Sequence, residues 1–132
     1  MNILFMAHSG LRWLVLFVAV IAIIKYLIGW LQGGQYKGMD RGLMAAFSGL
    51  MDLQSLLGVI LLVWSGLTGV GFPFFRIAHG LIMVAAAVVA HLSRRWKNAD
   101  DGTRFRNDLF LIVGSLILVL IGISILPGGL SR

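Results

Sequence analysis

Two histidine–arginine pairs are the residues of this sequence best suited to chemistry. His8 precedes Arg12 by four positions, and Arg76 precedes His79 by three. On a helix, these spacings place each arginine on the same face as its histidine. Two imidazoles at one level can supply both axial ligands of a haem iron, and guanidinium groups match haem carboxylates bidentately. The pattern predicts a b-type haem ligated by His8 and His79, with the two arginines at its propionates.

A glycine accompanies each pair. Gly10 lies two residues after His8, and Gly80 directly follows His79. Because glycine has no side chain, both positions would leave room for a flat macrocycle, and we include them in the predicted cofactor site. At about 1.5 Å per residue, the two histidines would lie roughly 8–9 Å into their helices, at one level. The alternative is that the histidines and arginines bind backbone, lipid headgroups or lipid phosphate without a cofactor.

A second group of polar residues lies toward the other ends of the apolar stretches. Asp52 and Gln54 are inside the second stretch, and His91 is near the end of the third. Carboxylates in membrane spans usually face the bundle interior, pair with a base or belong to a proton path. The three residues predict a polar track for quinone protonation or proton delivery. Alternatively, Asp52 joins helices, with Lys25 as its partner, and His91 is an interfacial residue.

The composition places these residues in a membrane protein. The chain of 132 residues is 59% hydrophobic and 12% charged, whereas soluble domains carry about 25% charged residues. Four apolar stretches, at about 3–31, 43–68, 73–96 and 109–126, are each long enough to cross a bilayer. They predict one all-α domain over residues 1–132, folded as an up-down-up-down four-helix transmembrane bundle. The uncharged fourth stretch is expected to be a wall of the bundle.

Basic residues predict the orientation of the bundle. The connections after the first and third stretches hold Lys37, Arg41, Arg94, Arg95, Lys97, Arg104 and Arg106. The opposite side holds only Arg12, Arg76 and Arg132. Because cytoplasmic loops are enriched in lysine and arginine, both termini and the haem are expected near the non-cytoplasmic face. The net charge of +6 then reflects membrane orientation, and no nucleic-acid recognition motif accompanies it.

The composition also removes several kinds of chemistry. The chain has no cysteine, which excludes covalent c-type haem attachment, thiolate zinc sites and iron–sulfur clusters. It contains no glutamate and none of the common hydrolase, Walker A or dinucleotide-binding motifs. With a haem as the predicted cofactor, we expect an electron-transfer subunit and not an enzyme that acts on its own.

The segment His8-Ser-Gly-Leu-Arg-Trp13 resembles a group of small four-span bacterial membrane proteins that are labelled cytochrome b-like. Those proteins carry a polar-x-Gln-x-x-x-Gly segment in the second span, which corresponds here to Asp52-Leu-Gln54-Ser-Leu-Leu-Gly58. A glutamate–histidine step opens their third span and corresponds here to Ala78-His79. Two departures are an aspartate at 52, where a histidine is common, and an alanine at 78 in place of the acidic residue. The resemblance covers essentially the whole chain.

The resemblance implies a multi-pass protein of the bacterial cytoplasmic (inner) membrane with a role in electron transport. The first function that we expect is a b-type cytochrome or a haem-carrying subunit of an electron-transfer complex. The second is a cofactor-free accessory subunit of a respiratory or photosynthetic complex, whose polar residues contact lipid, quinone or neighbouring helices. The third is a small proton-coupled transporter that uses Asp52. The expected partners are other membrane subunits and lipids.

Overall fold

The computed structural model describes residues 2–128 and is built from long α-helices. They are α1 (Asn2–Leu31), α2 (Gly38–Ser65), α3 (Phe74–Ala90) and α4 (Asp101–Ser124), and the described residues contain no strand. Four helical segments are long and apolar enough to cross a membrane. The predicted all-helical, four-span architecture is confirmed, and it indicates a multi-pass membrane protein.

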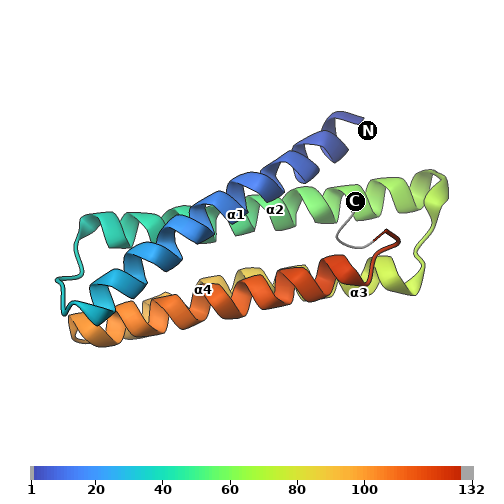
Figure 1. The fold of residues 1–132 in the computed structure, drawn as a ribbon. Coiled ribbons are helices and arrows are strands. Elements are labelled where there is room, and N and C mark those ends of the chain that lie inside the picture. The colour runs from blue at the N-terminus through green and yellow to red at the C-terminus, as the bar shows by residue number, and fades with distance from the viewer. Residues whose placement is uncertain (1, 129–132) are drawn as a thin grey trace.

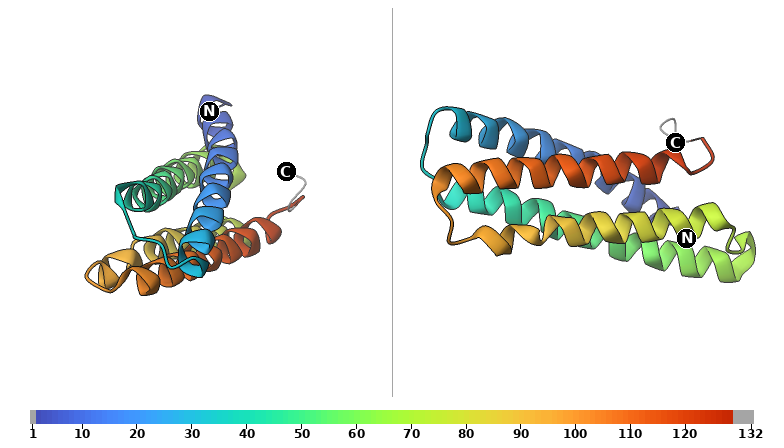
Figure 2. Two further views of the ribbon diagram at one scale, coloured as in Figure 1. Left: turned by 60° about the vertical axis from the view of Figure 1, so that its left-hand side comes forward. Right: turned by 90° about the horizontal axis from the view of Figure 1, so that it is seen from below.

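The four helices form a bundle in which they pack closely at one end and spread apart at the other. Each helix packs against its neighbours in sequence, and α4 packs back against α1. The α1–α2 and α3–α4 connections lie together at the end that we call the closed end (Figure 1). From there α1 crosses the bundle obliquely, so that its N-terminal half diverges from α4, as Figure 2 also shows. We call this second end, which includes the α2–α3 connection, the open end.

Helices α2 and α4 both begin earlier than the hydropathy pattern predicts, because polar residues cap their first turns. In α2, the Asp40 carboxylate accepts a hydrogen bond from the backbone nitrogen of Lys37 at 2.9 Å. Before α4, Asp100 accepts hydrogen bonds from the hydroxyl and the backbone nitrogen of Thr103, at 2.7 and 3.2 Å. Both bonds favour the charged carboxylate and hold the pKa of Asp100 below its usual value. Hydropathy detects only the apolar part of each helix.

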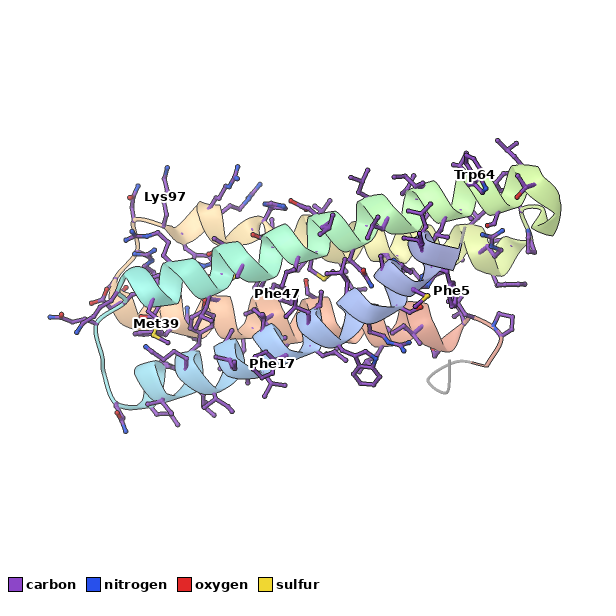
Figure 3. All side chains as sticks on the ribbon, turned by 90° about the horizontal axis from the view of Figure 1, so that it is seen from above. Phe5, Phe17, Met39, Phe47, Trp64 and Lys97 are labelled. Atoms are coloured by element: carbon purple, nitrogen blue, oxygen red, sulfur yellow. The ribbon has the colours of Figure 1, made fainter. Side chains whose placement is uncertain are left out.

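Small residues allow the helices to approach one another closely. Ala19 and Ala22 of α1 and Ala86 of α3 are buried, as the packing of helices in a bilayer requires. Phe47 of α2 lies between the helices (Figure 3) and is completely buried. Helix α4 contributes more buried residues than any other helix, and its Ser115 donates a hydrogen bond to the Ala86 carbonyl at 2.8 Å. The fourth span is therefore the most buried wall of the bundle.

A buried hydrogen-bond network around Asp108 of α4 fastens the closed end. Its carboxylate accepts hydrogen bonds from the Ser93 hydroxyl at 2.6 Å and from the Trp96 indole at 2.7 Å. Both donors belong to the 3-10 helix Leu92–Trp96, which follows α3. The Tyr36 hydroxyl of the α1–α2 connection donates to the same carboxylate. Burial, reinforced by the Asp108 carboxylate, raises the pKa of Tyr36 and keeps this phenol a neutral donor.

A second buried carboxylate, Asp40, ties α1 to the start of α2. Its Oδ1 atom lies 2.7 Å from Nζ of Lys25, and its backbone carbonyl accepts a hydrogen bond from the Tyr26 hydroxyl at 2.6 Å. The ring of Phe105 from α4 packs against this tyrosine. Lys25 therefore pairs with Asp40. The alternative prediction from the sequence, in which Lys25 pairs with Asp52, is wrong.

We expect Asp108→Ala to destabilise the protein by about 2–4 kcal/mol, because the change leaves one buried and two partly buried donors without their acceptor. Thermal unfolding of the detergent-solubilised protein, followed by circular dichroism, measures the loss. Asp101→Ala is the matched control, since it removes an exposed carboxylate of the same helix and should change stability by less than about 1 kcal/mol. Equal losses in the two variants would contradict a fastening role for Asp108.

Candidate functional site

The open end of the bundle contains a cavity of about 280 Å³ that is lined by residues of all four helices. His8 of α1 and His79 of α3 both border it, and most of the other lining side chains are apolar. A second cavity, of about 370 Å³, shares both histidines with the first and extends toward the α2–α3 connection. We call the two spaces the first and second histidine cavities. The structure thus brings the two predicted ligands to one place.

His79 is oriented by a backbone carbonyl of α4. Its Nδ1 atom lies 2.7 Å from the carbonyl oxygen of Gly122. A carbonyl oxygen can only accept, so Nδ1 carries a proton and donates, and in the neutral ring the lone pair is then on Nε2. Histidines that ligate metals are commonly held in this way through the other ring nitrogen. The missing side chain at Gly122 lets α3 approach α4 closely, since a Cβ atom there would lie 2.8 Å from Cε of Met83 and 3.3 Å from Cγ2 of Ile82.

His8 is held between its own helix and α2. A Cβ atom at Gly58 would lie 3.1 Å from Cε1 of His8, so the imidazole packs directly against the α2 backbone. The Gln54 side chain donates a hydrogen bond from Nε2 to the His8 carbonyl at 2.7 Å. Nδ1 of His8 and Oε1 of Gln54 are buried and have no hydrogen-bond partner within residues 2–128. Buried polar atoms are normally bonded, so these two atoms are the ones that a ligand in the cavity could contact.

The two arginines have different surroundings. Arg12 borders the first histidine cavity, and its guanidinium carbon lies 5.0 Å from the centre of the Trp13 ring. Arg76 borders the second cavity and donates hydrogen bonds to the Gly71 carbonyl, at 2.9 Å, and to the Ser65 hydroxyl. Arg76 therefore fastens the α2–α3 connection as well as facing a cavity. Arg12 therefore reaches the first cavity beside His8, and Arg76 reaches the second beside His79.

The glycines at the cavities differ from those predicted. Gly80 lines both histidine cavities, as expected for a residue that leaves space there. Gly10 is exposed, lines neither cavity and would accept a Cβ atom without any contact within 4 Å. Gly58 of α2, and not Gly10, is the glycine that leaves space beside the imidazole of His8. The sequence contained a signal for it, because Gly58 is four residues from Gln54 and so lies on the same face of α2.

The second predicted group of polar residues is divided between two places. Asp52 and His91 form an ion pair on the outer surface of α2 and α3, with Nε2 of His91 at 2.9 and 2.8 Å from the two carboxylate oxygens. Their side chains are 53% and 36% exposed, and neither residue lines a histidine cavity. Gln54 faces the first cavity instead. The three residues therefore do not form one polar track.

No family model, curated protein or solved structure matches this chain. The residues that carry the resemblance nevertheless converge in space, because His8, Gln54, Gly58 and His79 all border the first cavity. Asp52 and Ala78, where the chain departs from the resembling proteins, line neither cavity.

We expect Gly58→Ala to be less stable than Gly49→Ala by at least about 1 kcal/mol. Both changes replace a glycine of α2 with a better helix former, which by itself stabilises by up to about 1 kcal/mol. At Gly49 the new methyl group meets nothing within 4 Å, whereas at Gly58 it presses on the His8 ring. Melting temperatures of the two variants measure the difference. Equal stabilisation by both changes would show that His8 is not packed against α2.

Proposed function

We propose that this protein is a membrane b-type cytochrome, or a haem-carrying subunit of an electron-transfer complex, with one haem ligated by His8 and His79. The observation that carries the proposal is that two imidazoles from different helices border one cavity. Haem iron takes only its axial ligands from the protein, because the porphyrin occupies the other positions. The hydrogen bond from Nδ1 of His79 to Gly122 also suits coordination through Nε2.

The remaining residues of the site fit this assignment. A bound haem supplies one-electron transfer chemistry. Arg12 would hold a propionate through its planar fork of donors, and Arg76 would contribute from the second cavity. Gly58 and Gly80 keep the walls flat, and the apolar lining excludes water from the ring. Nδ1 of His8 is buried without a hydrogen-bond partner within residues 2–128, so this imidazole has a ring nitrogen that no described protein group occupies.

We further propose that the protein lies in the bacterial cytoplasmic membrane with both termini on the non-cytoplasmic side. The basic residues of the α1–α2 and α3–α4 connections support this orientation, since such residues favour the cytoplasmic face. The histidine cavities then lie near the non-cytoplasmic face. The protein partners of such a subunit would be other membrane subunits of an electron-transfer complex.

A second candidate function is that of a cofactor-free accessory subunit whose cavity holds a quinone. The observation in its favour is that His8 and Gln54 present unbonded polar atoms to an otherwise apolar space. A quinone headgroup offers hydrogen-bonding oxygens on an apolar ring, and most small-molecule sites combine those features. The third alternative, a transporter based on Asp52, has no such support, because Asp52 pairs with His91 on the outer surface.

The purified protein, once reduced with dithionite, is expected to show the alpha band of a bis-histidine b-type haem. His8→Ala and His79→Ala should each abolish the band, because each removes an axial ligand. His91→Ala is the matched control, since this histidine lies outside the cavities, and it should retain the band. A colourless but folded wild-type protein would refute the haem proposal, and quinone in its lipid extract would then favour the second candidate.

Substitution of the two arginines should separate cofactor binding from stability. Arg76→Gln is expected to destabilise the haem-free protein by about 1–3 kcal/mol, because the Gly71 carbonyl and the Ser65 hydroxyl lose a charged donor. Arg12→Gln should weaken haem retention, because it removes the guanidinium group that borders the first histidine cavity. Haem titration and melting curves of both variants check these expectations. A wild-type haem affinity in Arg12→Gln would remove Arg12 from the site.

A further inference from the structure

The closed end of the bundle carries a dense group of exposed cations. Six exposed basic side chains lie there, in the connections and in the first two turns of the helices that follow. We call them the basic surface, and its members are Lys37, Arg41, Arg94, Arg95, Lys97 and Arg106. Lys97 extends away from the helices at this end (Figure 3). Neither ion pair of residues 2–128 involves any member of the basic surface.

The tertiary structure brings these cations together from two distant parts of the sequence. Asp108 binds Tyr36 of one connection and Ser93 and Trp96 of the other, so the two connections are fixed side by side (Figure 1). The guanidinium carbon of Arg104 lies 3.8 Å from the centre of the Tyr36 ring and adds a second link. The basic surface is thus presented by a rigid base, which reduces the entropy lost when a ligand binds.

The carboxylates of this region do not neutralise the basic surface. Asp40 and Asp108 are buried and already bonded to Lys25 and to the network donors. Asp100 and Asp101 are exposed, but they are fewer than the six cations. The region therefore has an excess of positive charge that is open to an anionic partner.

Apolar side chains accompany the cations. Leu31, Met39 and Leu92 are 71%, 62% and 37% exposed and lie at the same end of the bundle. Met39 is in the first turn of α2, between Lys37 and Arg41. A phospholipid combines a phosphate with acyl chains, so a surface that alternates cations with apolar side chains matches both of its parts. A free phosphate ion would use the cations alone.

We propose that the basic surface binds the phosphate groups of anionic phospholipids, with the adjoining apolar residues against the upper parts of the acyl chains. Four membrane-crossing helices place this end of the protein at headgroup level. The arginines are suited to the task because their planar guanidinium groups bind phosphate bidentately. This proposal does not depend on the haem, since the basic surface and the histidine cavities are at opposite ends of the bundle.

The test uses the full chain in detergent micelles, titrated with phosphatidylglycerol, with phosphatidylcholine or with inorganic phosphate. Native mass spectrometry and melting temperature report binding. Phosphatidylglycerol should bind and raise the melting temperature, and the other two probes should have much smaller effects. The triple variant Arg94→Gln, Arg95→Gln, Lys97→Gln should weaken phosphatidylglycerol binding by about tenfold or more, because each cation near an anionic surface contributes measurably. The double variant Lys37→Gln, Arg41→Gln tests the other connection independently.

The matched control is Arg94→Lys with Arg95→Lys, which keeps both charges and should retain most of the preference for phosphatidylglycerol. High salt should weaken the binding, since exposed charges are screened. Equal responses to phosphatidylglycerol and phosphatidylcholine would overturn the proposal, and so would an equal response to inorganic phosphate. Full binding by both glutamine variants, once their helical circular dichroism matches the wild type, would place any lipid site elsewhere.

Discussion

The carboxylate of Asp108 is the contact on which the shape of this bundle depends. Helices in hydrocarbon gain little from burying apolar surface against one another, so their association relies on small residues and polar bonds. Asp108 joins the two connections of the closed end through Tyr36, Ser93 and Trp96. Asp40 adds a bond between α1 and α2 through Lys25. With one end held in this way, α1 can diverge from α4 toward the other end, and the histidine cavities lie in the space that results.

The polar groups at the two ends of the bundle consequently differ in how completely they are hydrogen-bonded. At the closed end the buried carboxylates are bonded on every side, as stability in a low-dielectric interior demands. At the open end His8 and Gln54 each retain a buried atom without a partner among the described residues, which costs about 1–3 kcal/mol for each such atom. Proteins tolerate such departures mainly at functional sites. The closed end thus has its buried carboxylates fully bonded, whereas the histidine cavities have buried polar atoms to which a ligand could bond.

The candidate site could be predicted from the sequence as far as helical periodicity extends. The spacing of His8 from Arg12, and of Arg76 from His79, drew attention to residues that the structure places at the cavities. Periodicity could not show that Gly10 faces outward while Gly58 receives the imidazole, because this depends on which side of α1 meets α2. It also could not pair Asp52 with His91 or Lys25 with Asp40. Those pairings depend on the relative rotation and height of separate helices.

The sequence by itself determined that the chain is helical, that it has four apolar segments and that cations gather in two connections. Each of these properties is local, since hydropathy, helix length and charge can be counted along the chain. Only the tertiary structure decided that the two histidines share a cavity, that α4 is the most buried wall of the bundle and that Asp108 unites the connections. Each of these depends on a few polar bonds and close helix contacts between residues far apart in the sequence. Such contacts leave no periodic trace in the sequence, because a single aspartate or glycine is enough to make them.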